Sequence, residues 1–259
     1  MKVLQLGGNG NLGSRVIPAL LAHNHAVVAY VRSPQKLRDI LPQSVVERIT
    51  IIQGDSLDTD AVADALRQNN CDALVNTSGT RQPRGQEQNL GKIVASVTSA
   101  AIQVGKDRGR PVRAWIIGGM SSLKYPGTPY QIQDYMPASL IGHQRGVEEA
   151  VKDLSTSDVQ WSLLCVAMMS PAHEKVQALA EPRKHNFLLQ SGTPPAWQDH
   201  WIRYVPFIGV YLNLVPTISS YTTKLEDVAD LIAEDLSKQK SEWVGEFVGF
   251  KAPKEEKSA

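Results

Sequence analysis

The chain has 259 residues, with 27 Lys and Arg against 26 Asp and Glu, which gives a formal net charge of +1. Hydrophobic residues make up 42% and charged residues 20% of the chain, a composition typical of folded globular domains. A chain of this length can bury a large core in one or two domains. The near balance of charge, without a long block of like charges, argues against a protein that binds nucleic-acid backbones.

The two cysteines, Cys71 and Cys165, lie far apart, and no CxxC pair or cysteine–histidine cluster is present. We therefore expect no disulfide framework, no metal site and a reduced, cytoplasmic setting. The apolar stretch at the N-terminus ends at Leu6, which is shorter than the ~7 to 15 residues of a signal-peptide core. The longest uncharged run, 205–223, is interrupted by prolines and by Asn213, so we expect no membrane span.

The first two thirds of the chain alternate short β-branched runs with longer amphipathic stretches, which is the pattern of βαβ units. A first strand is expected at 2–6, followed by a glycine-rich turn and a helix at 12–23. Further strands are expected at 27–31, 49–52, 73–75, 114–117 and 161–166, and further helices at 34–41, 59–68, 90–104 and 141–154. Six such strands predict an α/β fold with a doubly wound parallel sheet of the Rossmann type.

From about residue 170 the connections lengthen and the alternation of strands and helices ends. The aromatic-rich stretch 197–214 has no clear secondary structure, whereas 224–238 predicts an amphipathic helix and 243–250 a final strand. Residues 251–259 are expected to form a solvated tail. We therefore predict three portions: a nucleotide-binding portion at 1–169, a smaller substrate-pocket or lid portion at 170–223, and a helix and strand at 224–250 that return to the first portion.

The segment after the first strand, GGNGNLG, satisfies two glycine fingerprints. GxGxxG would use Gly8, Gly10 and Gly13, whereas GxxGxxG would use Gly7, Gly10 and Gly13. A strand that enters such a turn and a helix that leaves it allow backbone N–H groups to reach a pyrophosphate. The residues expected to bind a dinucleotide cofactor here are Gly7, Gly8, Asn9, Gly10, Asn11, Leu12 and Gly13.

The end of the second strand indicates which dinucleotide is bound. Asp or Glu ~20 residues beyond the glycines usually binds a free ribose 2′-hydroxyl, whereas Arg there accommodates a 2′-phosphate. This chain has Arg32 and Lys36, with no acid until Asp39. Because a guanidinium can donate two hydrogen bonds to a phosphate, we expect NADP(H) rather than NAD(H). The alternative is a solvated surface pair.

Three further motifs accompany the glycine turn: VRSPQKL at 31–37, GDS at 54–56 and NTSG at 76–79. With them, residues 1–166 resemble the atypical short-chain dehydrogenase/reductase superfamily, in particular its NmrA-like and biliverdin/flavin reductase-like branch. The predicted helix near 222–236 extends the resemblance. It implies that Asp55 and Ser56 lie against the adenine, and that Ser78 and Gly79 lie beside the pyrophosphate or the nicotinamide ribose. Without the resemblance, Asp55 would be interpreted as a helix or turn cap.

The superfamily's usual YxxxK pair is missing, because no tyrosine is followed four residues later by lysine. By the resemblance, Leu140 and Gln144 occupy the two positions. A hydride can still pass to a well-stacked conjugated acceptor while a proton comes from solvent or a nearby acid. The candidate catalytic residues are His143, which could instead contact the cofactor ribose, Ser121 and Tyr135. Helix or loop capping is the alternative for His143 and Ser121.

Methionine and aromatic residues gather around the predicted boundary and beyond it, which suits a small hydrophobic or aromatic substrate. The spacing of Trp197, Trp201 and Tyr204 would allow them to share one helix face. A dimer interface or ordinary core is the alternative interpretation. The candidate pocket residues are Met120, Tyr130, Met168, Met169, Trp197, Trp201 and Tyr204.

These features favour an NADPH-dependent oxidoreductase that transfers a hydride to a small hydrophobic acceptor with a conjugated or carbonyl group. Two alternatives stay open. The missing YxxxK pair also fits a non-catalytic, NADP(H)-sensing regulatory protein, as the resemblance to NmrA-like proteins implies, and the same fold could serve an isomerase or cyclase. A homodimer is an open alternative for the quaternary structure.

Overall fold

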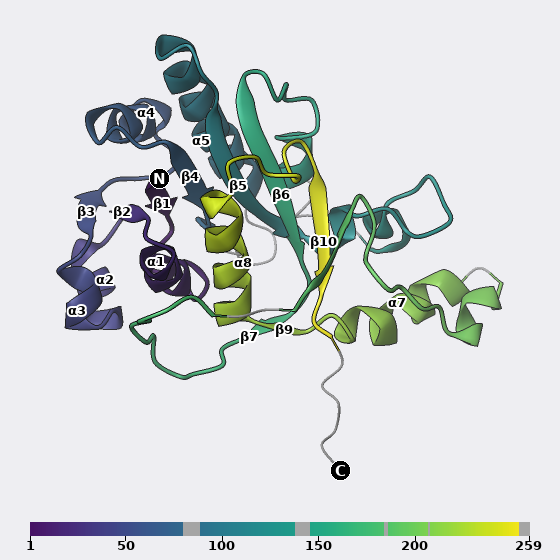
Figure 1. The fold of residues 1–259 in the computed structure, drawn as a ribbon. Coiled ribbons are helices and arrows are strands. Elements are labelled where there is room, and N and C mark those ends of the chain that lie inside the picture. The colour runs from purple at the N-terminus through teal and green to yellow at the C-terminus, as the bar shows by residue number, and fades with distance from the viewer. Residues whose placement is uncertain (80–88, 138–145, 184–185, 207, 254–259) are drawn as a thin grey trace.

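An eight-stranded sheet organises the chain (Figure 1). The computed structural model describes residues 1–79, 89–137, 146–183, 186–206 and 208–253. Seven strands of the sheet are parallel, and β8 joins its edge antiparallel to β10. In spatial order the strands are β3 (Thr50–Gln53), β2 (Ala26–Val31), β1 (Lys2–Leu6), β4 (Ala73–Asn76), β5 (Val112–Gly119), β6 (Val159–Val166), β10 (Phe247–Lys251) and β8 (Leu188–Ser191).

Helices cover both faces of the sheet. α1 (Gly13–Ala22) packs beside α8 (Leu225–Ser237) on one face, and α4 (Thr59–Gln68) packs beside α5 (Leu90–Asp107) on the other (Figure 1). Successive strand residues point to opposite faces, so Val3 joins the core under α1 while Leu4 joins the core under α4. Burial on both faces explains why the strands are continuous apolar runs rather than alternating ones.

The turn after β2 places charged residues at the carboxyl end of that strand. α2 (Pro34–Ile40) begins with proline in its first turn, and the Ser33 hydroxyl accepts a hydrogen bond from the Lys36 backbone N–H at 3.3 Å. A capping serine followed by proline is a strong helix start. α3 (Gln43–Val46) then leads back to β3.

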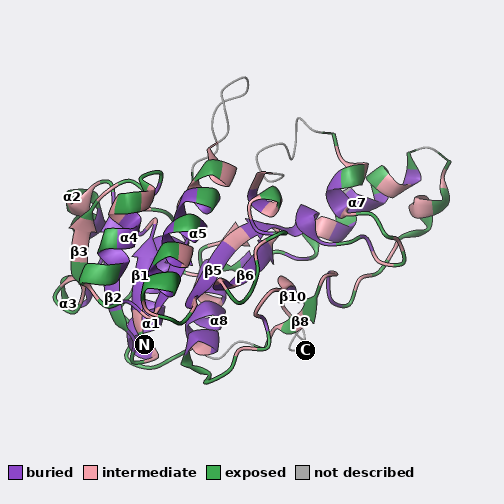
Figure 2. Cartoon of the chain, turned by 90° about the horizontal axis from the view of Figure 1, so that it is seen from above, coloured by how far each residue is buried: buried purple, intermediate pink, exposed green. Residues whose placement is uncertain are grey.

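A smaller portion projects from the sheet beyond β6. It includes the 3₁₀ turn η3 (Trp201–Tyr204) and α7 (Gly209–Ser219), which extends away from the strands in Figure 2. Tyr125 joins it to the main portion by donating a hydrogen bond to Asp199 at 2.5 Å, and Asn213 donates to the same Asp199 oxygen at 2.8 Å. Burial and the Asp199 carboxylate raise the pKa of Tyr125 to about 12, so this tyrosine remains a neutral donor.

Several predicted boundaries differ from the structure. The last strand begins at Phe247 rather than 243, because residues 242–245 form a turn in which Gly245 has φ +81°. Lys251 belongs to this strand and not to the tail, and its ammonium lies 4.2 Å from the centre of the Tyr221 ring. β8 was not predicted, since a four-residue edge strand has almost no periodicity to detect. The predicted helix at 141–154 falls partly outside the described residues.

The stretch of ambiguous type contains one real helix, α7, although Pro216 lies inside it. Two short elements complete the smaller portion: β7 (Met169–Ser170) and β9 (Thr223–Lys224) pair in parallel. Within the described ranges, no helix is both long and apolar enough to cross a bilayer.

Candidate functional site

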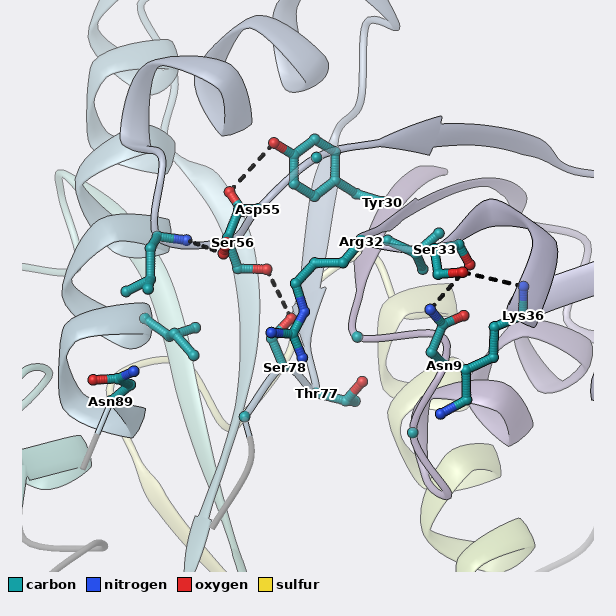
Figure 3. A pocket seen from close by; sticks show the side chains of 17 residues that line it. Asn9, Tyr30, Arg32, Ser33, Lys36, Asp55, Ser56, Thr77, Ser78 and Asn89 are labelled. Atoms are coloured by element: carbon teal, nitrogen blue, oxygen red, sulfur yellow. Dashed lines mark hydrogen bonds between the residues drawn. The ribbon is translucent and has the colours of Figure 1, made fainter. Parts of the chain in front are cut away.

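A cavity of about 520 Å³ lies at the carboxyl ends of β1, β2, β3 and β4 (Figure 3). The strand order reverses direction here, between β1 and β4, and ligands of open α/β sheets bind at such a switch point. The cavity is lined by Gly7, Asn9, Gly10, Tyr30, Val31, Arg32, Ser33, Lys36, Gly54, Asp55, Ser56, Leu57, Thr77, Ser78, Gly79, Asn89 and Ile93.

The glycine turn shows which of the two fingerprints the fold uses. Gly7 has φ +86°, and a Cβ there would lie 2.6 Å from the Ser78 backbone nitrogen. A Cβ on Gly13 would lie 2.2 Å from the Gly7 carbonyl oxygen. Gly7 and Gly10 line the cavity, whereas Gly8 is backed by side chains of the core and does not. The structure therefore favours GxxGxxG, in which Gly7 and Gly13 are required by close backbone approach.

The N-terminus of α1 is open to an anion. No described side chain caps this helix, and its first turn contains no acidic residue. The first backbone N–H groups of a helix have no intrahelical partners, and the helix dipole adds positive potential at this end. Asn11 and Leu12 precede the helix but do not line the larger cavity, and Leu12 lines a second cavity beside it.

Two cations line one side of the cavity. Among the described residues, neither the Arg32 guanidinium nor the Lys36 ammonium pairs with a carboxylate, and both side chains line the cavity. Asn9 donates a hydrogen bond to the Ser33 carbonyl oxygen at 3.1 Å, which joins the glycine turn to the segment that carries both cations. Figure 3 shows Arg32 extending from the side of Ser33 and Lys36 toward Ser78.

Tyr30, which the motifs did not single out, forms part of the cavity wall. Its ring passes so close to Gly54 that a Cβ there would lie 2.1 Å from it, and its hydroxyl donates to the Asp55 carbonyl oxygen at 3.4 Å. Burial, followed by the charges of Asp58 and Asp55, raises the pKa of Tyr30. A neutral aromatic ring at this point offers a flat apolar surface. Its position at the carboxyl end of β2, two residues before Arg32, was the available sequence signal.

The opposite wall brings together residues from the segments that follow β3 and β4. The hydroxyls of Ser56 and Ser78 are 2.9 Å apart, although 22 positions separate them in the sequence. Asp55 accepts a hydrogen bond from the Leu57 backbone N–H at 3.0 Å, as a turn-capping aspartate does. The structure thus gathers nine of the residues expected to bind cofactor around one cavity: Gly7, Asn9, Gly10, Arg32, Lys36, Asp55, Ser56, Ser78 and Gly79.

A second cavity, of about 230 Å³, adjoins the first one and shares Thr77, Ser78 and Gly79 with it. Its other described lining residues are apolar or glycine: Leu12, Leu90, Ile117, Gly118, Gly119, Val147 and Met169. Within that described lining, the only polar side chains are the hydroxyls of Thr77 and Ser78. The space is suited to an apolar group placed directly beside the first cavity.

The predicted substrate residues are scattered. Met169 lines the second cavity, whereas its neighbour Met168 is 63% exposed. Met120 is buried in the core, and Tyr130 is 58% exposed. Only one member of the candidate set therefore lines either of these two cavities, and the substrate role of every member stays a prediction.

The prediction that Trp197, Trp201 and Tyr204 share a helix face is wrong. Trp197 lies in a loop, with its ring 5.3 Å from that of Tyr125 and 6.0 Å from that of Tyr221. Trp201 and Tyr204 lie in η3 and are 78% and 80% exposed. Helical spacing does not predict a shared face here because the helix is absent between 197 and 201.

Neither Ser121 nor Tyr135, the two catalytic candidates among the described residues, lines either of these two cavities. Ser121 is buried in η1 (Met120–Ser122), and the Tyr135 ring, in η2 (Ile132–Tyr135), lies 5.3 Å from the Tyr125 ring. His143 lies outside the described residues. The catalytic roles of all three stay predictions.

The described residues contain no group of three or more His, Cys, Asp and Glu that could hold a metal ion. Both cysteines are buried, and burial raises the pKa of Cys71 to about 11 and also raises that of Cys165. Neither thiol is activated as a nucleophile.

Comparison with known families agrees with this geometry. Residues 7–188, about 70% of the chain, match the family described as NAD(P)H-binding. The chain belongs to this family. The predicted α/β fold of the Rossmann type is confirmed, and the predicted resemblance is borne out for NAD(P)H binding and, in fold, by solved short-chain dehydrogenases/reductases. The matched region includes the glycine turn, both candidate cations and the two serines of the opposite wall.

Individual relatives of this NAD(P)H-binding chain are distant. UDP-glucose 4-epimerase of Neisseria meningitidis serogroup C is 24% identical over 184 residues, which are 67% of this chain and 54% of the epimerase. The chain thus spans about half the length of the curated relatives it matches.

Two solved structures share its fold across almost the whole chain. A short-chain dehydrogenase/reductase of Veillonella parvula, in complex with NADP, has a TM-score of 0.61 at 14% identity and covers 98% of this chain and 95% of its own. A protein of Streptococcus pneumoniae proposed to be an NADH-flavin reductase has a TM-score of 0.64 at 17% identity and covers 98% and 100%.

Proposed function

We propose that this protein is an NADPH-dependent oxidoreductase that transfers a hydride to a small hydrophobic acceptor with a conjugated or carbonyl group. The observation that carries the proposal is a cavity lined by two cations, Arg32 and Lys36, that have no carboxylate partner among the described residues, beside an apolar cavity with which it shares residues 77–79. This arrangement separates a site for a 2′-phosphate from a site for an apolar reactant.

The residues present fit a dinucleotide. Gly7 and Gly13 lie too close to neighbouring backbone to accept a side chain, so the turn presents backbone rather than side chains to a diphosphate. Arg32 and Lys36 would bind the 2′-phosphate, Ser56 would lie against the adenine, and Ser78 would lie beside the pyrophosphate or the nicotinamide ribose. When bound, NADPH supplies the hydride.

The apolar cavity would bind the acceptor. Leu90, Ile117 and Met169 exclude water and hold a flat acceptor against the first cavity. Since the sequence contains no YxxxK pair, protonation of the reduced acceptor is assigned to solvent or to a nearby acid. Conjugated acceptors such as quinones, flavins and enones suit such a site because they need no dedicated tyrosine.

The experiment is a turnover assay with purified protein, NADPH and a panel of quinones, flavins and enones, followed by loss of nicotinamide absorbance. NADH in place of NADPH is the matched control. We expect turnover of at least one conjugated acceptor with a preference for NADPH. Tight NADPH binding without turnover of any acceptor would contradict the proposal.

The missing YxxxK pair also supports a second candidate, a non-catalytic protein that senses NADP(H). Such a protein must bind a partner with different affinity in its two cofactor states, since a ligand regulates only through differential affinity. Partner capture in NADP⁺ and in NADPH distinguishes the two candidates, because equal capture in both excludes sensing. A homodimer stays a prediction that sedimentation of the wild-type chain and of Trp201→Ser would test.

A further inference from the structure

Arg15, in the first turn of α1, is buried although it is charged. Its side chain is 7% exposed and donates to three acceptors on three separate segments. Nε donates to the Glu226 carboxylate at 2.7 Å, Nη1 to the Asn11 carbonyl at 3.0 Å, and Nη2 to the His173 carbonyl at 2.7 Å. A cation in the first turn of a helix interacts unfavourably with the helix dipole. We therefore expect the contacts that Arg15 makes to offset this cost.

Glu226, at the start of α8, completes the junction. Its carboxylate accepts the Ala172 backbone N–H at 2.7 Å and the His173 backbone N–H at 3.3 Å, in addition to Arg15. Burial disfavours the charged carboxylate, but the hydrogen bonds from Ala172 and Arg15 outweigh it and lower the pKa of Glu226. The pair therefore remains charged and holds three chain segments together.

Two of these segments lead directly to walls of the apolar cavity. Asn11 immediately precedes Leu12, and Ala172 follows Met169 by three residues. Leu12 and Met169 both line that cavity. Asn11 also belongs to the glycine turn, so the junction contacts the cofactor-binding turn and lies one to three residues along the chain from two walls of the apolar cavity.

We infer that Arg15 is a positioning residue: by bridging the Asn11 carbonyl, Glu226 and the 172–173 backbone, it sets the spacing of the Leu12 and Met169 walls and couples cofactor binding to the order of segment 171–179. The inference rests on the proposed function, because it assigns NADPH to the larger cavity and the acceptor to the smaller one. Arg15 is not a catalytic residue, since it lines neither cavity.

The test is Arg15→Lys, which keeps the charge but cannot supply three donors in a fixed fork. Two ligands are compared: NADPH, and adenosine 2′-monophosphate, which reaches only the end of the cavity near Arg32. Because the variant loses charged hydrogen bonds, its affinity for NADPH should fall about ten-fold, while its affinity for adenosine 2′-monophosphate should stay unchanged. Arg110→Lys, in an exposed pair with Asp72, is the matched control and should change neither affinity.

Hydrogen exchange supplies a readout that a purely structural role would not move. In the wild-type protein NADPH should slow amide exchange in 171–179, and adenosine 2′-monophosphate should not. Arg15→Lys should lose the NADPH-dependent slowing. If Arg15→Lys fails to fold, Glu226→Gln carries the same test, because it removes the charge from the shared carboxylate and keeps the shape of the side chain.

Equal weakening of both ligands in Arg15→Lys, or an unchanged exchange response, would overturn the inference and leave Arg15 with a structural role. The proposed reductase function fails separately, if the wild-type protein binds NADPH and shows the exchange response but reduces no acceptor. The two failures are thus distinguishable.

Discussion

Replacement of Arg32 by glutamine or glutamate tests the assignment of the 2′-phosphate site. Arg32 and Lys36 line the cavity and have no carboxylate partner among the described residues. The 2′-phosphate, with a charge of about −1.5 to −2 at neutral pH, is present in NADPH and missing from NADH. The substitution should therefore weaken binding of NADPH far more than binding of NADH.

The magnitude follows from the exposure of the side chain. A hydrogen bond to a charged group contributes about 1.5–3 kcal/mol, and because Arg32 is exposed the loss should lie near the lower limit. Since 1.4 kcal/mol is a factor of ten, Arg32→Gln should raise the Kd of NADPH roughly ten-fold. Arg32→Glu adds repulsion between like charges and should raise it further, while the Kd of NADH stays close to that of the wild type.

The assay is a fluorescence titration with each dinucleotide, with the tryptophans of the protein as the reporter. Added salt should reduce the difference between wild type and Arg32→Gln, because exposed charges are screened beyond about 10 Å at 0.1 M ionic strength. Arg48→Gln is the matched control, since Arg48 is exposed and does not line the cavity. An equal loss of affinity for NADPH and NADH would refute the assignment.

Three further predictions concern stability and the glycine turn. Gly13→Ala should abolish NADPH binding because its Cβ would lie 2.2 Å from the Gly7 carbonyl oxygen; unchanged affinity in a titration would show that the turn relaxes. Asp235→Ala should lower the free energy of unfolding, measured in urea, by about 3–5 kcal/mol, because it leaves the buried Arg113 guanidinium without its carboxylate partner. A loss below about 1 kcal/mol, as for an exposed pair, would contradict this prediction. Burial lowers the pKa of His25 below 6.5, so the unfolded chain takes up a proton at a higher pH than the folded chain does. The free energy of unfolding should therefore fall as the pH drops through 6.5. His25→Gln should reduce this pH dependence, and an unchanged pH profile of the variant would count against the role of His25.

Much of the cofactor platform could be predicted because its signals are local. The alternation of apolar strands and amphipathic helices depends on residues a few positions apart, and so does the strand–glycine–helix turn at 7–13. Arg32 and Lys36 were found in the same way, since they follow a strand directly. The structure confirms the doubly wound, mostly parallel sheet and brings these segments to one edge of it.

Other features depend on contacts that no local pattern encodes. Tyr30 becomes part of the wall because Gly54, from the next strand, leaves room for its ring. Trp197 packs on Tyr125 instead of sharing a face with Trp201. All of these residues can be seen in the sequence, but their surroundings depend on contacts with residues that are distant in the chain.

Local patterns were enough to predict a nucleotide-binding α/β fold, its glycine turn and the charge that follows the second strand, because periodicity and turn chemistry act over short distances. The folded arrangement was needed to show that Gly7 rather than Gly8 begins the fingerprint and that an apolar cavity adjoins the larger one. It also showed that Arg15 meets Glu226 across 211 positions of the chain. Such contacts form when helices pack on a common sheet, and packing depends on the shape of the whole core.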